Sequence, residues 1–425
     1  MSDDAGDPDS YRNHKRWFPK HPEIGPAGVD AEPFHSKEQY DLEVQKLWPH
    51  VWLMVGRAEE IPAVGDYLVK QIPTTQMAVI VVRGRDGVIR AFHNVCPHRG
   101  SQICWEDKGS VAAFTCPYHA FTFNLEGKLT FVPDEANFYD LDKSKTGMIP
   151  VVCDVWEGFV FVHLDPNPAE TLKEFLGEVG ESLAHYPFHE RTRYYEYKAV
   201  IDCNWKVLIS GFLEAYHARA LHARSVNRIS SKDNPYAHND FIRMFDKHRV
   251  ISLFSNPAMT PTRLGKIAYA HFERSQHLDE AAPSGAEAAE AEPSDAEAVF
   301  RRINKSYLIH NIFPNFQLNL VRGNWFRHQF WPIAPDKVMW EVRIYYAKPK
   351  NASQRFFQDY SRFTSRDNLM EDVEASERSQ PALNSGVLKR WILQDEEVVI
   401  QHFNKVVHDY THGQTPAGQP AAAAE

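Results

Sequence analysis

The stretch Cys96-Pro97-His98-Arg99-Gly100 is followed by Cys116-Pro117-Tyr118-His119, with seventeen residues between His98 and Cys116. Each stretch offers one thiolate and one imidazole within a few residues. Such side chains bind zinc or an iron–sulfur centre, and ligand chemistry alone fits both about equally well. The two stretches therefore predict a metal site and leave open which metal it holds.

Sequences typical of β-strands surround both stretches. Apolar and polar residues alternate, and the turn sequences Arg85-Asp86-Gly87 and Glu126-Gly127 interrupt them. The strand-like segments are residues 61–72, 77–95, 121–132 and 156–164. We expect an N-terminal arm over residues 1–35, followed by a small all-β domain over residues 36–168 that begins with a helix. Both metal-binding stretches then lie in loops of this domain.

The loop positions favour an iron–sulfur centre over zinc. In a zinc finger the later pair of ligands commonly lies on a helix, whereas here each pair lies between strands and each cysteine precedes a proline. One cysteine and one histidine from each loop match the ligands of a [2Fe-2S] cluster. Cys96 and Cys116 would bind one iron of this cluster. His98 and His119 would bind the other, and a structural zinc ion is the alternative.

Residues 169–410 predict a second domain of mixed structure. Apolar and polar residues alternate over 316–320 and 338–346, as in half-buried antiparallel strands, and helical patterning begins near Trp205. We therefore expect an α+β protein whose C-terminal domain is an antiparallel sheet with packed helices.

Two segments have compositions that disfavour a packed core. Residues 280–298 consist mostly of Ala, Glu, Pro, Ser and Asp, which predicts a mobile acidic insert, with an Ala/Glu-rich helix as the alternative for part of it. Residues 411–425 predict a disordered tail on the same grounds.

The overall composition argues against several classes of protein. The chain has 47 Lys and Arg against 56 Asp and Glu, a net charge of -9, and no basic run that would bind nucleic acid or an anionic membrane. No segment approaches 18 consecutive apolar residues, and the N-terminus lacks the features of a signal peptide, so we expect a cytoplasmic protein. Five cysteines are too few for a disulfide framework in 425 residues.

A second group of candidate ligands lies in the segment EAYHARALH, residues 214–222. On a regular helix the side chains of His217 and His222 would point about 140 degrees apart, so they converge on one ion only if the helix is irregular. Two histidines and one carboxylate form the facial triad of non-haem Fe(II) enzymes, and Asp372 is a candidate for the carboxylate. The adjacent Glu371 is the competing candidate.

Together, the two cysteine–histidine stretches and the sequence NWK…EAYHARALH, residues 204–222, resemble the α subunit of the Rieske non-haem iron ring-hydroxylating oxygenases. The resemblance covers roughly residues 40–410. It implies a Rieske [2Fe-2S] domain and a catalytic domain of the SRPBCC, or helix-grip, type. It also implies that His217, His222 and Asp372 bind the mononuclear Fe(II).

Glu214 occupies a position at which this family carries an acidic residue, commonly Asp. In the family this residue links a histidine of the mononuclear iron to a Rieske histidine of the neighbouring subunit. The present chain carries Glu instead. The resemblance thus implies that electrons cross between subunits, and therefore a homotrimer or an α3β3 assembly.

The resemblance further implies a terminal oxygenase that uses O2 and electrons from NAD(P)H. A separate reductase, with or without a ferredoxin, would deliver the electrons, because the chain carries no Gly-rich dinucleotide fingerprint. We expect a ring-hydroxylating dioxygenase that hydroxylates or dihydroxylates an aromatic or polycyclic hydrophobic substrate, or secondly an aromatic carboxylate. The alternative is a monooxygenase that dealkylates at N or O, or hydroxylates, an alkyl ammonium or methoxy-aromatic compound. A non-catalytic electron carrier would not need the second metal site.

The sequence also indicates where a substrate would bind. An apolar pocket is expected beside Phe212 and along residues 311–332, which are rich in Phe and Trp, although the same side chains serve equally well in a sheet core. Arg322, Arg327 and His328 are the candidates to hold a substrate carboxylate.

Overall fold

The computed structural model of the protein describes residues 16–184, 186–225, 234–239, 241–253, 262–273, 307–321 and 324–413. The chain divides into two compact units. The first unit comprises Asp41–Phe175 with Tyr410–Glu425, and the second comprises Met1–Tyr40 with Leu176–Asp409. The insert expected at residues 280–298 lies outside the described residues, as does the tail from residue 414 onward.

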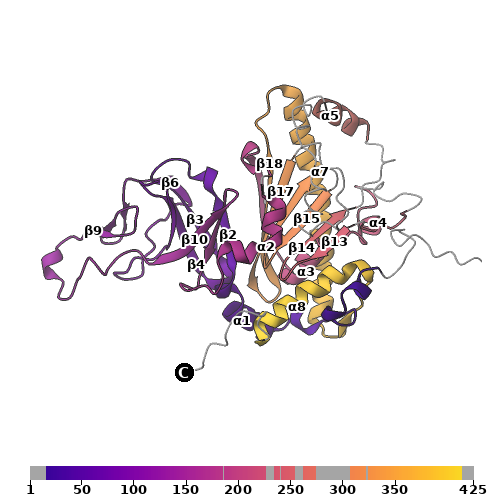
Figure 1. Ribbon diagram of the computed structural model, residues 1–425, viewed down its shortest axis with the longest axis horizontal. Coiled ribbons are helices and arrows are strands. Elements are labelled where there is room, and N and C mark those ends of the chain that lie inside the picture. The colour runs from indigo at the N-terminus through magenta and orange to yellow at the C-terminus, as the bar shows by residue number, and fades with distance from the viewer. Residues whose placement is uncertain are drawn as a thin grey trace, which may run out of the picture. The chain divides into compact units, whose positions relative to one another are not determined.

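The first unit is built from two antiparallel sheets (Figure 1). The larger has seven strands in the order β2-β11-β10-β5-β4-β3-β6, and the smaller has three in the order β7-β8-β9. The strands are β2 (Trp52–Arg57), β3 (Asp66–Ile72), β4 (Met77–Arg83), β5 (Ile89–His93), β6 (Lys108–Ser110), β7 (Phe114–Thr115), β8 (Thr122–Phe123), β9 (Leu129–Phe131), β10 (Pro150–Trp156) and β11 (Phe159–His163). Helix α1 (Lys37–Lys46) precedes them.

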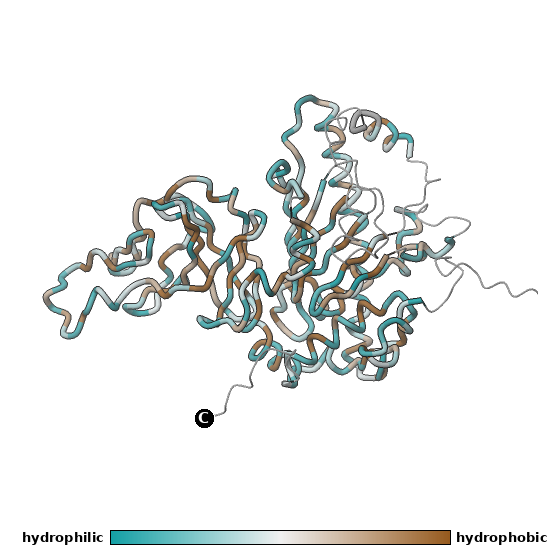
Figure 2. The backbone as a smooth tube through the Cα atoms, in the orientation of Figure 1, coloured by the Kyte–Doolittle hydropathy of each residue, from teal (hydrophilic) through white to brown (hydrophobic). Residues whose placement is uncertain are grey.

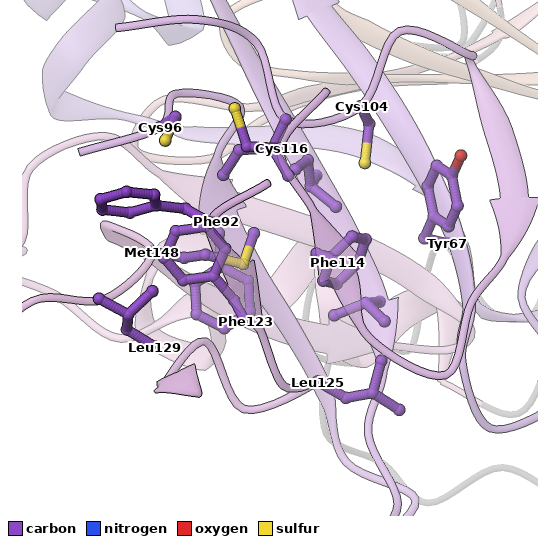
Figure 3. Close-up of a cluster of buried hydrophobic side chains, with 14 of the residues drawn as sticks. Tyr67, Phe92, Cys96, Cys104, Phe114, Cys116, Phe123, Leu125, Leu129 and Met148 are labelled. Atoms are coloured by element: carbon purple, nitrogen blue, oxygen red, sulfur yellow. The ribbon is translucent and has the colours of Figure 1, made fainter. Parts of the chain in front are cut away.

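The core of the first unit is a cluster of aromatic and aliphatic side chains that includes two of the candidate ligands (Figure 3). Phe92 and Met148 pack in this cluster together with Cys96 and Cys116. The turn between β8 and β9 depends on Gly127, whose φ is 82° and at which a Cβ atom would lie 2.4 Å from the Phe92 ring. A side chain at position 127 would therefore collide with the core that supports the cysteines.

The second unit contains a seven-stranded antiparallel sheet in the order β12-β18-β17-β16-β15-β14-β13. Its strands are β12 (Arg193–Ile201), β13 (Phe241–Met244), β14 (Arg249–Leu253), β15 (Tyr307–Ile312), β16 (Phe316–Val321), β17 (Asn324–Ala334) and β18 (Lys337–Tyr346). A separate pair joins β1 (Val29–Asp30) to β19 (Arg390–Trp391).

Helices accompany this sheet, and α2 begins in the first unit. The α-helices are α2 (Leu172–Leu183), α3 (Trp205–Gly211), α4 (Ala218–Leu221), α5 (Arg263–Glu273), α7 (Ala352–Asn384) and α8 (Val398–His412). Short 3-10 helices are η1 (Phe18–Lys20), η2 (Pro22–Ile24), η3 (Glu32–Phe34), η4 (Trp48–His50), η5 (Ala58–Glu60), η6 (Pro73–Thr75), η7 (Glu135–Asn137), η8 (Phe188–Glu190) and η10 (Asp395–Glu397).

Both faces of β17, a central strand of the large sheet in the second unit, are buried. Alternate residues of a strand point to opposite faces. Phe330 of β17 points toward Phe212 at the end of α3, whereas Trp325 points to the other face and contacts Phe188 of η8. This double burial explains why residues 324–332 read as an almost continuous run of large side chains.

The expected α+β class is confirmed, with an N-terminal β domain and a C-terminal antiparallel sheet with packed helices. Hydrophobic segments, brown in Figure 2, follow the strands of both units. Within the described ranges, no helix combines the length and the apolar character needed to cross a bilayer.

Candidate functional site

The two cysteine–histidine loops of the first unit share one backbone conformation. In each loop the fourth residue after the cysteine, Gly100 or Ala120, has positive φ (76° and 58°) and donates its N–H to the cysteine carbonyl at 2.9 Å. The carbonyls belong to Cys96 and Cys116. Two equivalent tight turns therefore present their side chains together, although the loops are distant in sequence.

The four candidate ligands are arranged as a cluster site requires. The Cys96 and Cys116 side chains are buried, and the half-exposed rings of His98 and His119 have centroids 4.6 Å apart. Nδ1 of His98 is buried and has no hydrogen-bond partner in the described part of the chain, while the ring stacks on Phe121 at 4.7 Å. A buried imidazole nitrogen without a partner is unfavourable unless a ligand such as a metal satisfies it.

In the second unit, His217 and His222 are brought together by a break in the helix. Helix α3 ends at Gly211, and the one-turn helix α4 begins after His217 and ends before His222. The two rings lie at the two ends of α4, with centroids 5.1 Å apart. The irregularity that the spacing requires is thus present between α3 and α4.

Asp372 joins this pair from the middle of α7. Oδ1 of Asp372 lies 3.3 Å from Nε2 of His217 and 3.0 Å from Nε2 of His222, and the side chain is buried. Among the described residues, Oδ1 nevertheless has no hydrogen-bond partner of acceptable geometry. Three ligand atoms that face a common point in this way can bind one divalent cation, which is more favourable than their direct contacts with one another.

Two further carboxylates contact the imidazoles at Nδ1, the ring nitrogen that does not face Asp372. Oε1 of Glu214 contacts Nδ1 of His217, and Oε2 of Glu214 accepts from the backbone N–H of His217 at 3.1 Å. Oε2 of Glu371 accepts from Nδ1 of His222 at 2.6 Å. Both rings therefore direct Nε2 toward Asp372, which is the arrangement that carboxylates impose on metal-binding histidines.

The sequence suggested Glu371 only as a competitor of Asp372, so its contact with His222 was missed. Glu371 and Asp372 are adjacent in α7, and each residue of a helix turns the chain by about 100 degrees, so the two side chains point in different directions. The surplus of carboxylates also makes the site electrostatically negative. Burial disfavours the imidazolium of His217, but the nearby carboxylates of Asp372 and Glu214 outweigh it and raise the pKa of His217 to about 10.

A group of four aromatic rings, here called the aromatic cluster, lies beside this site. The ring of Phe212, two residues before Glu214, has its centroid 4.8 Å from His328, 5.9 Å from Phe330 and 6.1 Å from Trp340. Nε1 of Trp340 donates to Nδ1 of His328 at 3.2 Å. Burial lowers the pKa of His328 to about 3, although the nearby charge of Asp372 opposes this. His328 is therefore neutral.

Other residues expected near a substrate lie elsewhere. Arg327 points to the opposite face of β17 from His328, where it contacts Gln329 and Tyr345. Arg322 lies outside the described residues.

Two family models match the chain. Residues 188–413, more than half of the chain, match the ring hydroxylating alpha subunit (catalytic domain). Residues 51–151 match the Rieske [2Fe-2S] domain. The matched ranges contain the candidate ligands of the second unit and of the first unit, respectively.

Similar proteins of known name share part of the chain. The glycine betaine monooxygenase oxygenase subunit of Chromohalobacter salexigens is 38% identical over 204 residues, which are 48% of this chain and 45% of that protein. The carnitine monooxygenase oxygenase subunit of Escherichia coli K12 is 30% identical over 195 residues, which are 46% of this chain and 52% of that protein. The chain thus spans about half the length of these relatives.

Solved structures share the fold over nearly the whole chain. The quaternary ammonium Rieske monooxygenase CntA in complex with L-carnitine has a TM-score of 0.70 at 18% identity and covers 96% of this chain and 99% of its own. Naphthalene 1,2-dioxygenase from Rhodococcus sp. bound to indole has a TM-score of 0.69 at 22% identity and covers 92% and 95%. The chain belongs to the family of ring-hydroxylating oxygenase α subunits, and it joins a Rieske [2Fe-2S] domain to the catalytic domain of the mononuclear iron oxygenases.

Proposed function

We propose that this protein is the oxygenase component of a monooxygenase that acts on a quaternary ammonium compound. O2 is the co-substrate, and a separate reductase, with or without a ferredoxin, delivers electrons from NAD(P)H. The observation that carries the oxygenase assignment is the convergence of His217, His222 and Asp372 in a chain that also has the two Rieske loops. The substrate class is supported by the glycine betaine and carnitine monooxygenase relatives.

The proposal assigns the metal ligands to named atoms. Nε2 of His217, Nε2 of His222 and Oδ1 of Asp372 hold a mononuclear Fe(II), while Cys96, Cys116, His98 and His119 hold the [2Fe-2S] cluster. When bound, the mononuclear iron supplies open coordination positions for O2, and the cluster supplies single electrons.

The carboxylates around the iron site determine where the protons of the ligand imidazoles lie and how the rings are oriented. Glu214 accepts the Nδ1 proton of His217 and so directs Nε2 at the metal, which would take the place of the Nε2 proton. Glu371 does the same for His222. We also assign to Glu214 the link to a Rieske histidine of a neighbouring subunit, within a homotrimer or an α3β3 assembly. CntA, which shares the fold, is described as revealing inter-subunit electron transfer.

The aromatic cluster suits the cationic end of an ammonium substrate. Trp and Phe faces attract a quaternary ammonium group by the cation–π interaction, and the stacking of Trp340 and Phe212 at 6.1 Å forms a broad aromatic surface. Both rings are buried, so this attraction is not weakened by contact with bulk water. Together with the glycine betaine and carnitine monooxygenase relatives, this arrangement supports the ammonium class ahead of the aromatic hydrocarbons expected first from the sequence.

Hydroxylation of an aromatic ring is the second candidate. An aromatic surface also binds an aromatic substrate, and naphthalene 1,2-dioxygenase shares the fold of this chain. The difference between the two functions lies in the product. One N-methyl group plus O2, two electrons and two protons gives a hydroxymethyl ammonium and water, and the former releases formaldehyde, a tertiary amine and a proton. Ring dihydroxylation gives a diol.

The test is a product screen with iron-loaded protein and a reconstituted reductase. Glycine betaine, carnitine and choline are compared with naphthalene, toluene and benzoate, and amines, aldehydes and diols are quantified. Formaldehyde or another aldehyde together with an amine is expected from an ammonium substrate. Diol formation without amine release would replace the proposed substrate class with aromatic compounds. The Asp372→Ala variant serves as the control, because it should keep the Rieske absorption spectrum and form no product.

A further inference from the structure

A guanidinium group is buried in the second unit without a carboxylate partner. Arg249, the first residue of β14, is 0% exposed. Its Nε donates to Nδ1 of His402 at 3.2 Å, its Nη2 donates to the carbonyl of Lys247 at 2.9 Å, and its Nη1 donates to Oδ1 of Asn311. Burial lowers the pKa of Arg249 to about 9, so the group stays charged at neutral pH. Within the described part of the chain, no anion balances this charge, and an unbalanced buried charge is strongly unfavourable.

The register of the sheet connects Arg249 to the candidate iron site. Arg249 pairs with Asn311, Asn311 pairs with Gln317, and Gln317 pairs with His328. Directly paired residues of antiparallel strands point to the same face, so these side chains form one row under α3 and α8. With strands about 4.8 Å apart, Gln317 lies about 5 Å and Asn311 about 10 Å from His328. The charge of Asp372 in turn acts on His328.

Three amide side chains on this face, here called the amide strip, have unsatisfied polar atoms. Nδ2 of Asn311, Oε1 of Gln317 and Nδ2 of Asn319 are buried and lack any hydrogen-bond partner among the described residues. Nε2 of Gln317 donates to Oδ1 of Asn319 at 3.4 Å, which leaves Asn319 with its N–H groups free. Buried amides are normally satisfied, so these atoms call for a polar partner that the described residues do not supply.

Asn319 lies close to the aromatic cluster. It pairs in register with Phe326, whose ring is 6.1 Å from Tyr307 and 5.4 Å from His328. The amide strip therefore begins beside the aromatic cluster and runs toward Arg249.

We propose that the amide strip binds the carboxylate of a zwitterionic ammonium substrate whose cationic end lies against the aromatic cluster. The proposal rests on the proposed function and extends it by naming the second recognition element of the substrate. The N–H groups of Asn311 and Asn319 donate to the carboxylate. Arg249 is a positioning residue, because it holds Oδ1 of Asn311 and thereby directs Nδ2 of Asn311 away from itself.

A small zwitterion has dimensions that match this arrangement. The strand spacing of about 5–10 Å from His328 to Gln317 and Asn311 is compatible with a ligand that has one to a few carbon atoms between its ammonium and carboxylate groups. A substrate that lacks the carboxylate would leave the amide N–H groups unpaired, so the strip would discriminate against it. Bound water alone would satisfy the same atoms without such discrimination.

The test compares equilibrium binding of two probes by calorimetry, with iron-loaded, unreduced protein under anaerobic conditions. Glycine betaine carries both groups, and choline carries only the ammonium. We expect the protein to bind glycine betaine at least tenfold more tightly. The Asn311→Asp variant places a carboxylate beside Arg249, and this carboxylate repels the carboxylate of the ligand. The variant should therefore bind glycine betaine at least tenfold more weakly. Its affinity for choline should change less than twofold. Asn319→Leu should act in the same direction.

A matched control exists on the opposite face of the sheet. There Gln329 accepts a hydrogen bond from the buried Arg327, so Gln329→Glu makes the same amide-to-carboxylate change beside a buried guanidinium. This variant should keep the preference for glycine betaine. Equal binding of both probes by the unmodified protein, or an unchanged preference in Asn311→Asp and Asn319→Leu, would overturn the proposal.

An error in the proposed substrate class can be distinguished from an error in the carboxylate-binding role of the amide strip. If neither ammonium probe binds, the proposed ammonium function is wrong, and the strip is tested with benzoate against benzyl alcohol. A selective loss of benzoate binding in Asn311→Asp would still support a carboxylate site, whereas no loss would overturn it. If Asn311→Asp does not fold, the result for Asn319→Leu decides.

Discussion

Nδ1 of His222 lies 2.6 Å from Oε2 of Glu371, the residue directly before Asp372 in α7. Oδ1 of Asp372 faces Nε2 of the same ring at 3.0 Å. Two consecutive carboxylates of one helix thus contact opposite edges of one imidazole. Ser225 also donates to Glu371 at 2.6 Å, which holds the carboxylate in place.

This relationship predicts a strong effect of Glu371→Ala on iron binding. Loss of the carboxylate behind a ligand histidine typically lowers metal affinity about 10- to 100-fold, because the ring is no longer oriented. Iron affinity is measured by competition with a chelator, and the Rieske absorption spectrum should stay unchanged. Glu374→Ala on the same helix is the control, since Glu374 pairs with Arg378 at the surface. Equal iron affinities of the two variants would contradict the assigned role of Glu371.

The role of Glu214 is tested by Glu214→Gln. The amide still accepts a hydrogen bond from His217, but it lacks the charge that a carboxylate offers to a partner histidine. We expect both iron centres to load fully and turnover to fall at least a hundredfold. Iron and sulfide contents are measured together with the rate at which the reduced cluster is reoxidised. Glu178→Gln, an exposed change on α2, controls for the loss of one negative charge. Retained activity would mean that electrons take another route.

Asn94 supports the first cysteine–histidine loop. Its Oδ1 accepts from the backbone N–H groups of Ile103 and Cys104, both at 2.9 Å, and its Nδ2 donates to the carbonyl of Cys104 at 2.7 Å. Asn94→Ala leaves these buried groups unpaired and should lower the free energy of unfolding by about 2–4 kcal/mol. Denaturant unfolding of the complete chain, followed through the Rieske absorption, measures the loss. Asn137→Ala removes an exposed hydrogen bond and should change the stability little.

Acid sensitivity should arise partly from His310. Burial lowers the pKa of His310 to about 3, and the backbone of Leu318 opposes this shift only in part. The folded protein therefore leaves this ring neutral, while the unfolded chain protonates it below about pH 6.5. The free energy of unfolding therefore keeps this contribution above about pH 6.5 and decreases as the pH falls, by about 2 kcal/mol at pH 5. In His310→Gln this part of the pH dependence should vanish. Parallel pH profiles of unfolding free energy for the two proteins would contradict the prediction.

The architecture could be predicted from local patterns. Alternation over residues 316–320 and 338–346 corresponds to β16 and β18, because successive side chains of a strand point to opposite faces and leave a period of two in its sequence. The loops of Cys96 and Cys116 were equally recognisable, since each loop carries its cysteine and histidine within a four-residue turn.

The candidate iron site was harder to predict from local sequence patterns. The spacing of His217 and His222 contradicted convergence on a regular helix, and the break between α3 and α4 resolved this only in three dimensions. The aromatic residues of β17 suggested an aromatic substrate, yet the strand is buried on both faces and its rings serve packing as well as recognition. The relatives that act on glycine betaine and carnitine support the ammonium alternative instead.

The sequence by itself determined the α+β class, the two cysteine–histidine loops and the set of side chains from which a second metal site is built. These features depend on spacing along the chain, which a sequence displays directly. Only the tertiary structure decided that Asp372 faces both Nε2 atoms while Glu371 holds His222, and that Arg249 stands in one row with Asn311 and Gln317. Helix rotation and strand register set these relationships, and both arise from the packing of segments that lie far apart in the chain.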